Sequence, residues 1–437
     1  MPLVKSPQRD GTVAVATAVC LIGILAVIAL SLDGGLLLDK RRQAQATADA
    51  AALAAASELY RTVFTHGGLD NGPLPNKTGP AAGEIAAFAR EVARVDGFED
   101  GQNGVTVEVH IPPVTGPFTG QAGHVEVKIT THQRRHFSRL FGPSDEIPIG
   151  ARAVARGRQT TIEDAMIILD PTLKGSFQTS GGGTVTATGS ASIVVNSSDP
   201  QAMIANGGGT VSATSYSLTG IPGWSTPGSG YFGGTIHSGQ PPMADPLRFL
   251  PQPDPSALVV QSKKRLTIVR DTVTTLSPGL YIGGISISGK GSVFLEPGIY
   301  YMQGGFSYSG HGSVTGHGVM IYNDPQSTSD TIDLSGLGTV TLTPPLEGPY
   351  KGMTLFQSRT SSFQPTVSVA GSASASMYMT GSFYVPQGQL KVTGNGTQDT
   401  LGSQYISDTL VISGNGSFNV HWDPKLVPAV REVWLVE

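Results

Sequence analysis

From Gly279 to Asp324 the sequence reads GLYIGGISISGKGSVFLEPGIYYMQGGFSYSGHGSVTGHGVMIYND. Short β-branched or aromatic runs alternate in this stretch with breaks that contain glycine. A β-solenoid requires this pattern, because each turn consists of short strands and tight corners and buries its inward side chains against the next turn. Glycine suits the corners since it adopts positive φ without steric cost. We therefore predict a right-handed parallel β-helix, that is, a β-solenoid.

The same texture extends from about Ile162 to the last residue, and we expect the solenoid domain to cover residues 159–437. The stretch keeps no fixed repeat length, which predicts irregular turns with excursions. Residues 224–257 are rich in Pro and Gly and are the predicted long excursion. A jelly roll or β-sandwich is the competing fold, but the strands here follow one another more closely than the spacing usual in those folds.

Toward the N-terminus, the run VAVATAVCLIGILAVIALSL, Val13–Leu32, contains no charged residue. Twenty helical residues cover roughly 30 Å, the thickness of the hydrocarbon core of a bilayer, so we predict a membrane-spanning helix. A cleavable signal peptide is the alternative, but its apolar core is normally shorter. Gly11 stands where prepilin processing sites carry glycine, yet Ala16 occupies the position at which pilin-type substrates carry Glu.

From Leu36 to Phe64 the chain lacks Gly and Pro and is rich in alanine, which predicts that the helix continues beyond the membrane. Small side chains recur at spacings of three and four, namely Ala44, Ala48, Ala51, Ala55 and Leu59. Such a stripe allows another helix to approach closely. It could pack on its own domain or on a partner helix, and the sequence leaves both open. We define residues 1–65 as the anchor and extended helix.

Residues 66–158 predict a small α+β domain. A Gly- and Pro-rich loop precedes a helix over 84–95, and the alternating segments 105–111 and 124–131 predict half-buried strands. The segments FSRLFG and IPIGARAVARG predict a short helix and a further strand. His132, Arg134, Arg135 and His136 could suggest a metal or phosphate site, but an exposed polar turn is favoured because no acidic partner stands at ligand spacing.

The N-terminal features together resemble the TadG-like module of Flp (Tad) pilus assembly proteins. The features that carry the resemblance are a basic leader with Lys5 and Arg9, one apolar helix, Asp33, the positions Arg42, Gln43 and Gln45, and the alanine run 48–56. The resemblance covers about the first 60 residues and implies a single-pass inner-membrane protein with a cytoplasmic N-terminus and periplasmic or extracellular C-terminal domains. It also implies two kinds of partner, namely the membrane and other pilus assembly proteins that the Ala-rich helix could contact.

Gly-rich regions also accompany such modules, and some relatives carry a von Willebrand A domain in their place. That domain binds a divalent cation through DxSxS. Here Asp170 is followed by Pro171, Thr172, Leu173 and Lys174. Thr172 keeps the hydroxyl of the first Ser position, but Lys174 replaces the second. An ordinary strand end is therefore favoured over a cation site.

The sequence of the solenoid leaves two other functions open. A β-helix polysaccharide lyase or hydrolase would draw on the segment GHGV with His317 and on Asp324, Asp330 and Asp333, but glycosidases need paired carboxylates and the sequence shows no such pair. An adhesin or carbohydrate-binding module on cell-surface polysaccharide would use a stripe of aromatic rings. The candidates for that stripe, which could equally be core ladders, are Tyr281, Tyr300, Tyr301, Phe306, Tyr308 and Tyr322.

Composition excludes several classes. The formal net charge of −4 gives no basic face for nucleic acid, and the one cysteine, Cys20, lies in the apolar run, so neither an intrachain disulfide nor a thiolate metal site is expected. The sequence therefore predicts a structural protein of pilus assembly that is not an enzyme, with no catalytic, cofactor-binding or metal-binding residue and no cofactor.

Overall fold

A computed structural model describes residues 12–65, 80–136, 145–189, 191–269, 271–371, 376–394, 396 and 399–437. The chain forms two compact units. The first consists of the N-terminal part up to Gln159 together with Arg431–Glu437, and the second of Thr160–Val430. The expected short helix over 137–142, Gly11 and most of the loop before the second helix lie outside the described residues.

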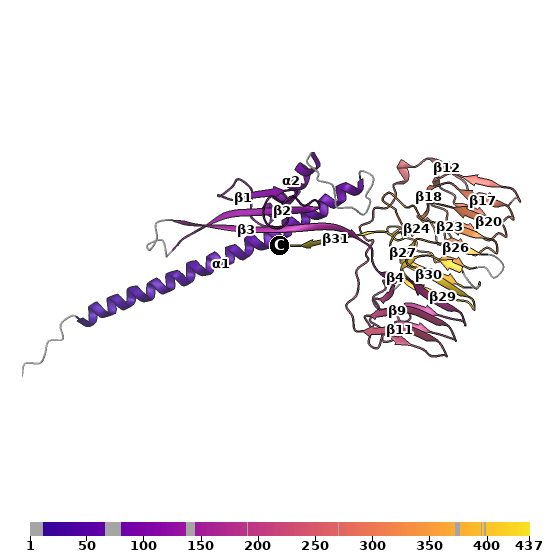
Figure 1. Cartoon of the computed structure of the whole chain (residues 1–437), viewed down its shortest axis with the longest axis horizontal. Helices are drawn as coiled ribbons and strands as arrows, with labels where there is room; N and C mark the ends of the chain where they lie inside the picture. Colours follow the sequence, from indigo (N-terminus) through magenta and orange to yellow (C-terminus); the bar gives the residue numbers. More distant parts are fainter. Residues whose placement is uncertain are drawn as a thin grey trace, which may run out of the picture. The chain divides into compact units, whose positions relative to one another are not determined.

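The first unit is a long helix and a shorter one packed on a small sheet (Figure 1). Its helices are α1 (Thr12–Thr65) and α2 (Pro80–Val95), and its strands are β1 (Thr106–His110), β2 (His124–Arg134), β3 (Glu146–Thr160) and β31 (Val430–Leu435). The sheet order is β1-β2-β3-β31, with β1–β2 and β2–β3 antiparallel. β31 shows that the chain returns to this unit after the solenoid, whereas the sequence placed its last residues with the solenoid.

The alanine stripe of α1 forms the core of the first unit. Ala44, Ala48, Ala51 and Ala55 have no exposed surface, and Leu59 has almost none. They pack in one cluster with Ile85, Ala89 and Ala93 of α2 and with residues from all three sheet strands β1–β3. Small side chains are needed because α1 lies close to both α2 and the sheet. Of the two possibilities that the sequence left open for this stripe, the structure shows packing on its own domain.

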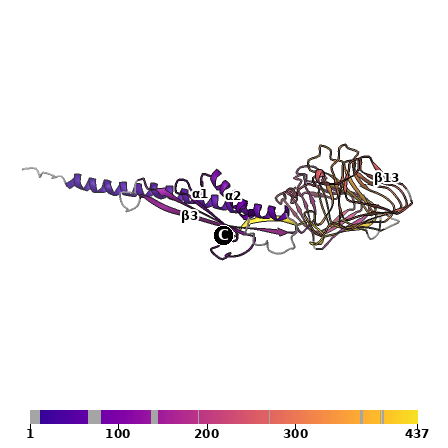
Figure 2. The same ribbon diagram turned by 90° about the horizontal axis from the view of Figure 1, so that it is seen from above.

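The second unit is a parallel β-solenoid of about ten turns (Figures 1 and 2). Its strands stack into three sheets, called here the first, second and third faces, and every pairing within them is parallel. Strands on the first face are β4 (Asp164–Ile168), β7 (Ser192–Val195), β12 (Val260–Ser262), β15 (Gly279–Tyr281), β18 (Gly298–Met302), β21 (Val319–Asn323) and β24 (Met353–Gln357).

The other two faces are built in the same way. The second face contains β5 (Phe177–Thr179), β8 (Met203–Ala205), β10 (Trp224–Ser225), β13 (Leu266–Ile268), β16 (Ile285–Ile287), β19 (Phe306–Tyr308), β22 (Ile332–Leu334) and β25 (Val367–Ala370). The third contains β6 (Thr184–Thr188), β14 (Thr274–Leu276), β17 (Ser292–Leu295), β20 (Ser313–Gly316), β23 (Val340–Leu342), β26 (Met377–Met379), β28 (Asp399–Leu401) and β30 (Ser417–His421).

Four longer strands bend around a corner. β9 (Thr210–Leu218) and β11 (Tyr231–Ser238) pass from the third face to the first, and β27 (Ser382–Thr393) and β29 (Gln404–Ser413) pass from the first to the second. Along the first face Leu280 pairs with Tyr301 and Tyr301 with Tyr322, two steps of 21 residues, but Tyr322 then pairs with Phe356. The turns are therefore irregular, as expected, because loops of different length are inserted at the corners.

The spatial order of the solenoid turns differs from their order in the sequence. The chain enters in the middle, at β4, and winds outward to β11 at one end. It then runs through residues 239–259, called here the strap, to β12 at the opposite end and winds back. The last turn finally pairs with the first, through β29 with β4 and β5 and through β30 with β6. The excursion expected over 224–257 is thus shorter, because β10 and β11 belong to the stack despite their Gly content.

Candidate functional surfaces

The first part of α1 is an exposed apolar surface. Val15, Val19 and Leu30 are each about two-thirds exposed, and the Ser31 hydroxyl donates to the Val27 carbonyl at 2.8 Å. α1 is the one helix in the described residues that is long and apolar enough to cross a membrane. These properties are those of a single-pass membrane anchor.

The polar residues that follow the span attach α1 to its sheet. The backbone N–H of His136, two residues after β2, donates to Asp33 Oδ1 at 3.2 Å. Gln45 Nε2 donates to the Arg152 carbonyl of β3 at 2.9 Å and to Asp49 Oδ1 at 2.8 Å. Asp33 and Gln45, two positions on which the family resemblance rests, therefore fix the helix to the domain.

A buried ion pair links β2, β3 and the end of the chain. Glu126 is fully buried, and it accepts from Arg152 Nε at 2.5 Å, from the Val114 N–H at 2.9 Å and from the Thr115 hydroxyl. Arg152 also pairs with Glu437 at 2.5 Å. Burial alone would raise the pKa of Glu126, but the hydrogen bonds from Thr115, Arg152 and Val114 outweigh it and lower the pKa to about 2. Such a group stays ionised and stabilises the structure, and no motif in the sequence indicated it.

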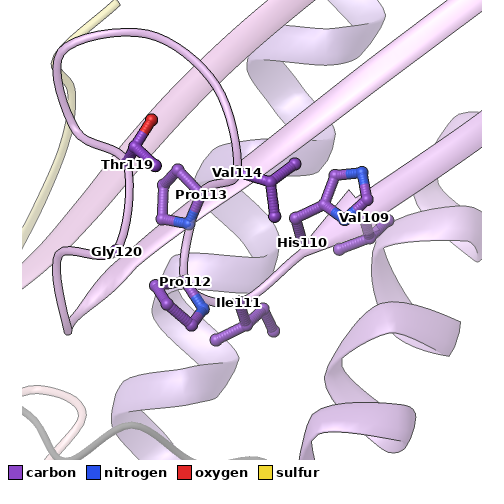
Figure 3. Close-up of a pocket in the computed structure, with 8 residues that line it drawn as sticks. All are labelled: Val109, His110, Ile111, Pro112, Pro113, Val114, Thr119 and Gly120. Carbon is purple, nitrogen blue, oxygen red and sulfur yellow. The ribbon is translucent and has the colours of Figure 1, made fainter.

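Beside this network lies a depression of about 530 Å³, shown in Figure 3. Its lining consists of Val109, His110, Ile111, Pro112, Pro113, Val114, Thr119 and Gly120. His110 is the lone titratable residue among them, and its Nε2 lies 3.4 Å from Glu108 Oε2. The other polar side chain of the lining is Thr119, whose hydroxyl donates to the Gly116 carbonyl at 2.7 Å, and the remaining side chains are apolar or Pro.

The candidate ligand residues of the sequence analysis do not converge. His132 Nδ1 faces the Gly104 carbonyl at 3.3 Å and Arg134 pairs with Glu146 at 3.6 Å. Asp170 Oδ1 accepts the N–H groups of Thr172 and Leu173 at 2.8 and 2.6 Å, which is a local turn after β4. Within the described residues no group of three or more His, Cys, Asp or Glu could hold a metal ion.

The residues considered for polysaccharide cleavage make local contacts at corners, in a loop and on a strand of the stack. His317, at the corner between β20 and β21, lies 3.3 Å from the Thr343 hydroxyl. Asp324 accepts from the Tyr301 hydroxyl at 2.9 Å, and Asp330 accepts from the Gln326 N–H at 3.1 Å within its own loop. Asp333 lies on the second face between Ser307 and Ser368. Asp324 and Asp330 thus belong to one loop, in which both accept from Gln326, whereas Asp333 lies on the strand β22 that follows it.

The aromatic residues are buried and form two ladders. Tyr281, Tyr300, Phe306 and Tyr308 belong to the inner core of the solenoid. The outer ladder on the first face contains Tyr301, Tyr322, Phe356 and Tyr384, whose successive ring centroids are 4.8, 5.0 and 4.9 Å apart. Neither ladder offers its rings to a sugar, so the expected polysaccharide contact through these residues is not supported.

The strap covers the outer ladder. Leu247 and Leu250 pack with it, Tyr384 donates to Asp245 Oδ2 at 2.6 Å, and the guanidinium of Arg359 donates to the carbonyls of Leu247, at 2.6 Å, and Leu250. Burial, and then the neighbouring Asp245, raises the pKa of Tyr384 well above its usual value, so the phenol remains a donor. No pattern in the sequence indicated these contacts.

Residues 11–58 match the family model described as "Putative Flp pilus-assembly TadE/G-like". The matched segment coincides with most of α1, that is, the apolar span and the alanine stripe that packs on the domain. No curated protein and no solved structure matches the chain. The N-terminal module is thus TadE/G-like, as the resemblance predicted.

Proposed function

We propose that this chain, which begins with a TadE/G-like module, is a membrane-anchored structural or accessory component of Tad-type pilus assembly. Its N-terminus lies in the cytoplasm, and the α+β domain and the solenoid lie on the other side of the inner membrane. The observation that carries the proposal is the coincidence of the matched segment with one helix that is both an apolar span and the core of a domain.

The rest of the molecule supports a structural role. The polar and aromatic residues considered for chemistry are engaged in turns, corners and core ladders, and the depression beside β1 has a single titratable group. A solenoid turns most of its sequence into a rigid, elongated stack, which suits a scaffold. We propose that the chain is not an enzyme.

The proposal is tested by an in-frame deletion in the source bacterium. Surface pili are counted by electron microscopy, and pilin is measured in the sheared fraction. We expect both to fall to background and to return when the full chain is supplied. Normal piliation in the deletion strain would overturn the pilus role; retention of the chain in washed membranes would still support the anchor.

A further inference from the structure

Both ends of the solenoid carry strand edges without a neighbour. Among the described strands, β12, β13 and β14 pair only with β15, β16 and β17, one turn further in. At the opposite end β10 pairs with β8, and β11 pairs with β9. Each end therefore presents one open strand edge on each of the three faces. Proteins usually protect such edges, because they are templates for pairing with another chain.

Exposed apolar side chains gather at these two ends. Val259, Val260, Val269 and Val273, in or beside the β12–β14 turn, are 71, 46, 60 and 72% exposed. At the other end Ile221 is 73% exposed, Tyr231 62% and Trp224 38%. A terminal turn that has to face water normally carries a polar outer surface.

The two ends fit each other. Each has its three strand edges in the same arrangement of faces, and all strands of the stack run parallel, so an end with β12–β14 can continue an end with β10–β11. The chain already contains such a junction, because the turn of β29 and β30 pairs with β4, β5 and β6 although more than 200 residues separate them in sequence. This internal junction shows that two stack ends join without continuous chain.

Charge does not oppose this contact. Exposed Lys263 and Lys264 lie between β12 and β13, and residues 224–238 at the other end contain no Asp, Glu, Lys or Arg. The strap contacts the ladder on the first face and leaves the strand edges at both ends unpaired.

We propose that the partner of each solenoid end is the opposite end of a second copy of this chain. The contact is heterologous and head to tail, so it can repeat. Continuing the register places His237 of one copy beside Val260 of the next, and Ser225 beside Thr267. This inference concerns the solenoid alone and does not rest on a role in pili.

The test uses the full chain with Cys20→Ser in detergent micelles. The double variant Ser225→Cys/Thr267→Cys is oxidised, and the products are separated by denaturing electrophoresis. We expect a ladder of dimers, trimers and higher species, because paired strands bring the two Cα atoms within disulfide range. A mixture of the two single variants should stop at a dimer. The control pair Thr267→Cys/Thr341→Cys, with one residue in the middle of the stack, should remain monomeric.

A second pair of variants separates a lost contact from a lost fold. Val269→Lys at the end should reduce the crosslinked species at least tenfold, whereas Phe294→Lys, an equally drastic change on an exposed side chain within the stack, should leave them unchanged. A monomeric double-cysteine variant, dimers from Ser225→Cys alone, or an equal ladder from the control pair would each overturn the proposal.

Discussion

Glu126 is the residue whose environment has the clearest energetic consequence. Its pKa in the folded chain is about 2, below its usual value, so its contribution to stability is fully present above about pH 5 and is lost as the pH falls toward 2. We expect Glu126→Gln to destabilise the first unit by about 3 kcal/mol at pH 7 and to flatten its pH dependence between these limits.

Hydrogen exchange of the β2 amides, followed by mass spectrometry in denaturant, measures this effect. Glu108→Gln is the matched control, because Glu108 is exposed on the neighbouring strand β1. Equal effects of the two substitutions, or an unchanged pH profile in Glu126→Gln, would contradict the assignment. Sequence could not predict this pair, since Glu126 and Arg152 meet only when β2 and β3 take their register.

Alanine size is the second property that matters at the scale of single residues. Ala48 is fully buried, whereas Ala46 on the same helix is exposed. Ala48→Leu should destabilise the first unit by about 1–3 kcal/mol through overpacking, and Ala46→Leu should change it little. Limited proteolysis of the purified variants measures this difference, and α2 should be cut faster in Ala48→Leu than in Ala46→Leu. Equal protection of α2 in the two variants would show that the stripe does not pack as described.

At the scale of elements, α1 is predicted well by its sequence. The apolar run and the alanine-rich continuation each indicated a helix, and the structure joins them into one helix of 54 residues, about 80 Å long. The sequence left open what covers the alanine stripe. Both a domain and a partner helix would select small residues, so only the packing with α2 and the sheet decides between them.

The strap is the element that sequence patterns described least well. Its Pro and Gly content predicted irregular chain but not its path along the first face. Arg359 fixes that path, because its guanidinium donates to two strap carbonyls and lies over the rings of Phe356 and Tyr384. This contact joins residues more than 100 positions apart.

We expect Arg359→Ala to release the strap, with local destabilisation of about 2–4 kcal/mol, because several charged hydrogen bonds to buried carbonyls are lost. Amide exchange should accelerate over 243–258 and remain slow in β15–β24. Arg248→Ala removes the same charge from an exposed strap residue and is the control. Unchanged exchange in Arg359→Ala would show that the strap is held by other contacts.

At the scale of the whole molecule, the alternation of short β-branched or aromatic runs with Gly-containing breaks in Gly279–Asp324 was enough to predict a solenoid. It was not enough to predict the order of its turns. Ile406 stacks on Ile167, and nothing local to either residue specifies that neighbour. Equally, β31 pairs in the sheet of the first unit although the whole solenoid separates it from β3 in sequence, so chain order alone could not place it.

The central proposal is that α1 anchors the chain in the inner membrane with the solenoid outside the cytoplasm. The most direct test places a single cysteine at Thr275, on the exposed third face, in a Cys20→Ser background. A membrane-impermeant maleimide is applied to intact spheroplasts, and Ser6→Cys serves as the opposite reporter. We predict labelling of Thr275→Cys before lysis and of Ser6→Cys only after lysis, with both on the full-length chain in the membrane fraction. Labelling of Thr275→Cys only after lysis would contradict the account.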